Sequence, residues 1–186
     1  MAANLPDVEG KKVVIVGTGN SGHDIAENLY ENGAAVTMLQ GRGRYALSLD
    51  RAVFMLHDDM HADNSPPTKE CDVVGESPPS PVQFALNIEG TKQISEADKE
   101  ILEGLERADF NLDFSIDGGG IAHLYFTHGG GYYVDVGCSK LIIDGKDQDG
   151  TELTADMDVL ATGYDDMKTK AQEVMGEKVA ARLKDV

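Results

Sequence analysis

A glycine-rich junction near the start of the chain constrains the fold more than any other feature. Val13–Val16 is a short, mostly β-branched apolar run, typical of a strand buried in a parallel sheet. Six residues rich in glycine follow it, and apolar residues then recur at helical spacing up to Gly33. A second apolar run, Ala35–Leu39, comes next. The sequence therefore predicts a strand–helix–strand unit with parallel strands and a right-handed connection.

The junction itself has the pattern G-x-G-x-x-G. In a dinucleotide site the first glycine permits a tight turn, the second lets the backbone approach a pyrophosphate, and the third lets helix and strand pack closely. The diphosphate then lies at the positive end of the helix. We expect it to be held by Gly17, Thr18, Gly19, Asn20, Ser21 and Gly22. A glycine turn without a ligand remains the alternative. The Asn20 side chain could contact groups on the nicotinamide side of the ligand or cap the helix, and we expect it to cap the helix.

The residues after the second predicted strand indicate which dinucleotide is bound. An NAD site usually has an acidic residue there, which accepts hydrogen bonds from the ribose hydroxyls. This chain has Gln40, Arg42 and Arg44 instead, and no acid. A guanidinium binds a 2′-phosphate that a carboxylate would repel, so NADP(H) is favoured over NAD(H). The alternative is that both arginines are simply solvated.

The rest of the chain completes the prediction of one α/β domain spanning residues 1–186. We expect a Rossmann-like parallel sheet with flanking helices, and a helical insertion after the second strand. Residues 57–81 are predicted to be a loop excursion and 82–108 a helical insertion, in which Ser95 and Asp98 start the second helix. The later predicted elements are an extended stretch at Phe110–Phe114, strands at Tyr132–Val136, Leu141–Ile143 and Val159–Ala161, and a helix at Met167–Leu183.

Charge and cysteine content exclude several classes of function. The 33 acidic residues outnumber 16 basic ones, and the net charge of −17 disfavours nucleic acids and membrane surfaces as partners. Two cysteines, far apart, match neither a disulfide framework nor a zinc site. With no signal peptide or membrane-spanning apolar run in the sequence, we expect a cytoplasmic protein.

Longer segments carry a resemblance to a known family. GKKVVIVGTGNSGHDIAENLYENGAAVTMLQ resembles the NADP-binding motif of flavin-containing monooxygenases, particularly their fungal and bacterial branch. Further similar segments are SPPTKECD, ADKEILEGLERADFNLDF, GGGYYVDVGCSKLIIDGK and DGTELTADMDVLATGY. Together they cover most of residues 10–186.

The resemblance implies a two-domain flavoprotein in which NADPH reduces FAD and the reduced flavin reacts with oxygen to oxygenate a substrate. The glycine turn would hold the pyrophosphate, and Arg42 or Arg44 the 2′-phosphate. Thr162, Gly163 and Tyr164 would belong to the ATGY segment where the chain passes back to the FAD domain.

Three departures from the family pattern shape the functional prediction. Only twelve residues precede Val13, so the FAD-binding domain is expected to be absent. MAANLPDVEG lacks the monooxygenase fingerprint with its histidine, and the 144–151 connection is shorter than in the family. We therefore expect a truncated NADP(H)-binding domain with no catalytic residue of its own, which partners an FAD-binding domain if one is supplied. Its exposed interface predicts weak self-association.

Other readings of the sequence remain open. The chain is alternatively a non-catalytic nucleotide- or protein-binding module, or a stand-alone NADP-dependent reductase that uses Tyr164 and Lys168. His57 and His61 have the spacing of zinc ligands on a helix, but their loop-like surroundings favour a solvated loop and no metal. His23 is expected to be a polar group on the helix surface.

Overall fold

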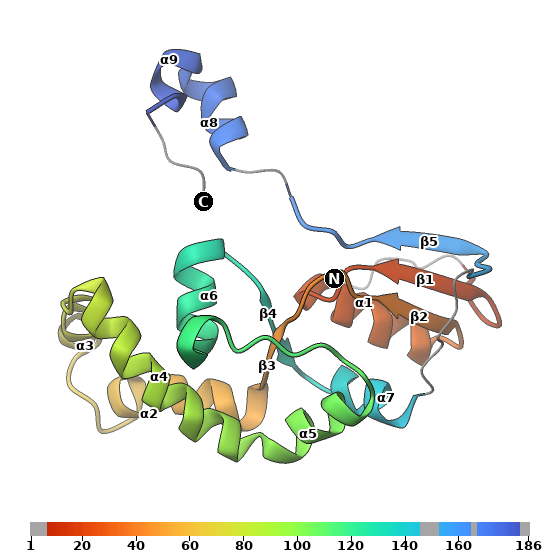
Figure 1. Ribbon diagram of the computed structural model, residues 1–186, viewed down its shortest axis with the longest axis horizontal. Coiled ribbons are helices and arrows are strands. Elements are labelled where there is room, and N and C mark those ends of the chain that lie inside the picture. The colour runs from red at the N-terminus through yellow and green to blue at the C-terminus, as the bar shows by residue number, and fades with distance from the viewer. Residues whose placement is uncertain (1–6, 146–152, 165–166, 183–186) are drawn as a thin grey trace.

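The fold is built on a parallel three-stranded sheet in the order β2-β1-β5 (Figure 1). The structure, a computed structural model, describes residues 7–145, 153–164 and 167–182. β1 (Lys12–Val16) pairs with β2 (Ala35–Leu39) on one side and with β5 (Met157–Leu160) on the other. These strands match the three predicted ones closely, and the predicted Rossmann-like α/β class is confirmed.

The helix α1 (Asn20–Glu31) connects β1 to β2 and packs on one face of the sheet (Figure 1). Its inward residues Ala26 and Leu29 are buried together with Val13 and Ile15 of β1. The helix ends where Gly33 adopts a φ of +84°, a conformation that glycine reaches without steric cost. The predicted strand–helix–strand unit is therefore present, and its two strands are parallel as expected.

A second, two-stranded parallel sheet was not predicted. β3 (Tyr45–Ser48) pairs with β4 (Tyr132–Asp135), residue Tyr45 opposite Tyr132. All four residues of β3 are buried, and its Tyr45 and Leu47 form a core cluster separate from that of the main sheet. The sequence prediction found β4 and missed β3, whose partner lies more than eighty residues away in the chain.

Helices fill the segment between the two strands of this second sheet. After the π-helical turn Leu49–Val53 come α2 (Phe54–His61), α3 (Thr68–Glu76), α4 (Ser80–Ala97) and α5 (Lys99–Arg107). The prediction of helices over 82–108 is confirmed, but that of a loop over 57–81 is wrong. Pro67 and Pro79 occupy the N-cap positions of α3 and α4, so these prolines precede helices and interrupt none.

The helix start predicted at Ser95 is also wrong. Ser95 lies inside α4, and the junction with α5 falls at Asp98. The Asp98 carboxylate is buried and accepts two hydrogen bonds from Ser48, one from its backbone N–H at 2.7 Å and one from its hydroxyl at 2.6 Å. The acidic residue that resembled part of a capping box therefore joins α4 and α5 to the end of β3.

Two predicted extended segments after α5 have other structures. The 110–114 stretch makes only an isolated bridge, between Leu112 and Arg44. The predicted strand at 141–143 lies inside the helix α7 (Cys138–Asp144), whose start is fixed because Asp135 accepts a hydrogen bond from the Ser139 N–H. Between them the chain forms a 3₁₀ turn at Ile116–Gly118 and the helix α6 (Gly120–His128).

The C-terminal part contains two short helices, not the single one predicted. α8 (Met167–Met175) and α9 (Glu177–Ala180) are separated by Gly176, whose φ is +84°. Most of the 144–151 connection, predicted to be shortened, lies outside the described residues. Within the described part of the chain, we find no helix with the length and apolar character needed to cross a membrane.

Candidate functional site

The carboxyl ends of β1, β2 and β5 meet at one edge of the main sheet, where the glycine turn lies. The Gly17 N–H donates to the Leu39 carbonyl at 2.9 Å, and the Ala161 N–H donates to the Val16 carbonyl at 2.8 Å. Both bonds extend the ladders just past the last strand residues. In open parallel sheets this edge is where ligands bind.

The three glycines of the turn differ in what surrounds them. A Cβ on Gly17 would collide with the backbone oxygen of Ala161, and Gly17 also has a φ of +115°. A Cβ on Gly22 would collide with the Gly17 carbonyl oxygen. At Gly19, in contrast, an added Cβ would meet no described heavy atom within 4 Å. Two glycines therefore permit close backbone packing, while the third leaves open space beside the turn.

The start of α1 offers free backbone donors to this open space. Its N-cap is Gly19, and among the described residues no side chain caps the helix and no acid lies in the first turn. The first amide paired along the helix is that of His23, which donates to the Gly19 carbonyl at 3.1 Å. The preceding amides of the first turn have no acceptor within the helix, so this end attracts an anion.

The polar side chains of the turn have other roles. The Asn20 Oδ1 accepts a hydrogen bond from the Val134 N–H of β4 at 2.8 Å, so the predicted capping by Asn20 is wrong. Ser21 is exposed at the helix start. Thr18 is 1% exposed, and its Oγ1 has no hydrogen-bond partner among the described residues. Only backbone groups of Thr18 and Asn20 therefore remain for a ligand at the turn.

The three candidate residues that follow β2, Gln40, Arg42 and Arg44, differ in their surroundings. The Gln40 side chain makes two hydrogen bonds with the backbone of Asn111, donating at 2.9 Å and accepting at 2.8 Å. Arg44 is half-buried in the bridge to Leu112, and its Nε lacks a partner within the described part of the chain. Arg42 is exposed. Arg42 is thus the more accessible of the two arginines that follow β2.

His23 is a site residue whose role the sequence did not indicate. The imidazole is 2% exposed and stacks on Tyr133, with centroids 3.6 Å apart and planes at 11°. Its Nδ1 lies 3.0 Å from the Gly19 carbonyl oxygen, which only accepts, so Nδ1 is the donor. Burial lowers the pKa of His23, and the hydrogen bond to the Gly19 carbonyl and the nearby carboxylates of Asp135 and Asp24 offset only part of this shift. The expected surface histidine is instead a buried group that fixes the turn to β4.

The ATGY segment is at the same edge of the sheet but is not enclosed. Ala161 contacts Gly17, whereas Thr162, Gly163 and Tyr164 are exposed. The Tyr164 side chain is fully exposed, with no packed surroundings to hold it for proton transfer. The segment follows the last strand of the main sheet, as the sequence predicted. No described side chain packs around Tyr164.

The histidine pair at 57 and 61 lies on a helix and not in the expected loop. The two rings on α2 have centroids 5.9 Å apart, and the His61 Nε2 is 4.0 Å from a carboxylate oxygen of Asp72. No group of three or more metal-binding side chains is assembled within the described residues.

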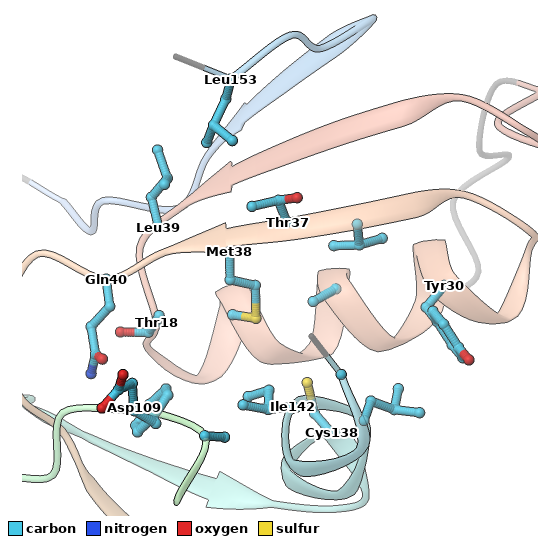
Figure 2. A pocket seen from close by; sticks show the side chains of 16 residues that line it. Thr18, Tyr30, Thr37, Met38, Leu39, Gln40, Asp109, Cys138, Ile142 and Leu153 are labelled. Carbon is cyan, nitrogen blue, oxygen red and sulfur yellow. The ribbon is translucent and has the colours of Figure 1, made fainter. Parts of the chain in front are cut away.

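A pocket of about 400 Å³ lies between β2, α1 and α7 (Figure 2). Its lining includes Met38, Phe110, Ile142 and Cys138, with Thr18 at one end. Burial raises the pKa of the Cys138 thiol to about 12, so this cysteine is a packing group and not a nucleophile. No sequence signal indicated the pocket, because its walls come from five separate segments of the chain.

A scan against models of known protein families finds no match to this chain, and a search of curated proteins finds none either. The resemblance to flavin-containing monooxygenases therefore stays a prediction from the sequence motifs.

Proposed function

We propose that the chain binds NADP(H) at the glycine turn between β1 and α1. The observation that carries this proposal is the contrast between the glycines: Gly17 and Gly22 are required by backbone packing, but Gly19 faces open space. Close backbone packing explains the first two glycines but not the third. A ligand that must approach the backbone closely would explain the third.

The residues present fit a dinucleotide. The unpaired amides at the start of α1 would receive the pyrophosphate, which needs no cation there because the helix end carries a partial positive charge. The exposed guanidinium of Arg42 would bind the 2′-phosphate. Gln40, already bonded to Asn111, would shape the site without being its main donor. Arg44 would contribute charge from its half-buried position beside His23.

The broader role follows the family that the sequence resembles. In a flavin-dependent monooxygenase NADPH supplies a hydride to FAD, and this chain would bind and orient that donor. The FAD and the oxygen chemistry would belong to an FAD-binding domain, so the residues of this domain would supply cofactor binding and not the oxygenation itself. We place this activity in the cytoplasm.

A non-catalytic binding module is the second candidate, and exposed apolar side chains favour it. Leu160 at the end of β5 is 76% exposed, and Leu39 at the end of β2 is 40% exposed. Such residues indicate a surface that another protein domain or a second copy covers, and they support weak self-association. The stand-alone reductase receives no such support, because Tyr164 is fully exposed.

Titration with NADPH and NADH in parallel, followed by nicotinamide fluorescence, tests the proposal. We expect saturable binding of NADPH, with NADH at least about tenfold weaker because it lacks the 2′-phosphate. Arg42→Ala should abolish that preference. Arg107→Ala, which removes an exposed arginine on α5, is the matched control and should preserve it. Equal affinity for both nucleotides in the unmodified chain would contradict the assignment to NADP(H).

A further inference from the structure

Ser115, just before the 3₁₀ turn, has a backbone conformation that residues other than glycine rarely adopt. Its φ is +63° and its ψ is −176°, a combination found almost exclusively in glycine. The Ser115 N–H donates to the carboxylate of Asp113 at 2.7 Å. On the other side, the Gly120 N–H donates to the Phe114 carbonyl at 2.9 Å. Strain that the surrounding bonds hold in place in this way is common at active sites.

The strained turn places the Ser115 hydroxyl against a histidine. Its Oγ lies 2.5 Å from the Nδ1 of His123 on α6. Glycine permits this approach, because a Cβ on Gly119 would collide with the Cβ of His123. Ser115 forms no helix-capping hydrogen bond with its side chain, although it occupies an N-cap position. Both side chains of the pair are half-buried, so the hydroxyl is committed to the imidazole near the surface of the molecule.

A serine hydroxyl bonded to an imidazole has the arrangement of a nucleophile and its general base. When Nε2 carries the ring proton, the Nδ1 of His123 accepts from the Ser115 hydroxyl and can remove its proton. In hydrolases with a nucleophile elbow, the serine likewise lies on a strained turn before a helix, and the next N–H helps to bind the oxyanion. Here the next N–H belongs to Ile116, and it donates no hydrogen bond among the described residues. This donor is therefore available to a developing negative charge.

Apolar side chains surround the pair. Phe84 of α4 packs edge-on against the His123 ring, with centroids 5.0 Å apart. Phe126 lies beyond Phe84, with centroids 6.4 Å apart, and is 48% exposed. Ile116, directly after the serine, is 68% exposed. These neighbours favour a substrate with an aromatic or short aliphatic group next to the bond that reacts.

The charges near the pair narrow the substrate further. Asp113 and Asp117 are exposed on either side of Ser115 in the chain, so they repel an anionic substrate and favour a neutral one. Within the described residues no carboxylate bonds to the His123 ring, whose hydrogen bond goes to Ser115. A histidine without such a partner is a weaker base in catalysis, so the leaving group must be a good one. Esters of phenols meet both requirements.

We propose that Ser115 and His123 form a catalytic site, separate from the glycine turn, that hydrolyses neutral aryl esters. The Ser115 Oγ bonds to the ester carbonyl carbon while the His123 Nδ1 takes its proton. The bond from that carbon to the phenol oxygen then breaks, and the phenol leaves with the proton. A water molecule next attacks the acyl carbon and gives a proton to His123. The bond to Oγ breaks, the carboxylic acid leaves, and the proton returns to Ser115.

Hydrolysis of para-nitrophenyl acetate tests the proposal, because the released nitrophenol is followed by its absorbance. We expect a rate above that in buffer and an acetyl group on Ser115, located by peptide mass spectrometry. Ser115→Gly removes the hydroxyl and adopts the positive φ without strain, so it should fold and react at least about tenfold more slowly. Ser80→Ala removes an exposed serine at the start of α4 and should keep the full rate. An unchanged rate in Ser115→Gly, or acetylation only elsewhere, would overturn the proposal.

Two histidine variants separate the general base from the slow reaction of any exposed imidazole with this ester. His123→Phe keeps an aromatic ring against Phe84 and should lower the rate at least about tenfold. His128→Phe removes an exposed histidine from the same helix and should keep the rate. Circular dichroism checks that both variants fold. Equal rates in the two variants would overturn the role of His123, and a loss of activity in Gly19→Val would overturn a site separate from the glycine turn.

Discussion

Asn20, at the first position of α1, accepts a hydrogen bond through its Oδ1 from the backbone N–H of Val134 in β4, over 2.8 Å. Beside this bond His23 stacks on Tyr133, the preceding residue of β4. Two contacts therefore join the glycine turn of the main sheet to the second sheet. The turn is held in position before any ligand arrives, which reduces the entropy that binding would otherwise cost.

Replacing Asn20 should loosen this connection. We expect Asn20→Ala to lower the free energy of unfolding by about 1 kcal/mol, because one hydrogen bond of the β4 backbone loses its partner. Ser21→Ala, at the neighbouring exposed position, should change it by less than about 0.5 kcal/mol. Urea denaturation measures both. Equal stabilities of the two variants would show that the contact with Val134 is unimportant for the fold.

The packed glycines should tolerate no side chain. Gly17→Ala and Gly22→Ala each place a Cβ against backbone oxygen, which cannot move as a side chain can, so we expect losses above about 2 kcal/mol. Gly90 in α4 is a matched control, since a Cβ there meets no described atom within 4 Å. Gly90→Ala should be neutral or stabilising by up to about 1 kcal/mol. Thermal unfolding of the three variants tests the prediction, and a stable Gly17→Ala would contradict it.

Stability should depend on the protonation of His23. Burial lowers the pKa of His23 below 6.5 in the folded chain, so the unfolded chain binds the proton first as the pH falls. Stability is therefore fully present above about pH 7.5 and declines below pH 6.5, by at most about 1.4 kcal/mol per pH unit from this group.

Two histidine variants isolate this contribution. His23→Phe keeps an aromatic ring against Tyr133 and removes the titrating group, so its stability should fall less between pH 7.5 and 5.5. His128 is exposed on α6, and His128→Phe should keep the pH dependence of the unmodified chain. Urea denaturation at several pH values provides the measurement. Parallel curves for the unmodified chain and His23→Phe would rule out the effect.

The buried carboxylate of Asp98 should be important for the helical insertion. Asp98→Ala leaves both the N–H and the hydroxyl of Ser48 without their acceptor in a buried place, so we expect a loss of about 2–4 kcal/mol. Asp50→Ala removes an exposed carboxylate next to the same arginine, Arg51, and should cost less than about 0.5 kcal/mol. Chemical denaturation compares the two, and a small loss in Asp98→Ala would contradict this role.

The sequence was most informative where structure is local. The β1–turn–α1–β2 unit follows from a short apolar run, three glycines and one helical period, all within about thirty residues. The helices α2 and α3 were missed because prolines and acidic residues are common in loops as well as before helices. β3 was missed because its burial comes from β4, far along the chain.

The site shows the same division between local and distant information. The spacing of glycines identified the turn, but the partners of its side chains come from elsewhere. His23 is buried because its ring stacks on Tyr133, and the Gln40 side chain is held by two hydrogen bonds with the backbone of Asn111. The pocket could not be predicted at all, because it exists only where β2, α1, α7, the 108–110 segment and Leu153 come together.

The most direct test of the central claim is calorimetric titration of NADPH into the unmodified chain and into Gly19→Val. A Cβ added at Gly19 meets no described atom of the fold within 4 Å, so the variant should still fold, and its thermal unfolding provides the control. That side chain occupies the space through which a pyrophosphate would approach the backbone, so we predict one-site binding to the unmodified chain and at least about tenfold weaker binding to the variant. Equal affinities, or no binding of NADPH to the folded unmodified chain, would contradict the assignment of the glycine turn as a nucleotide site.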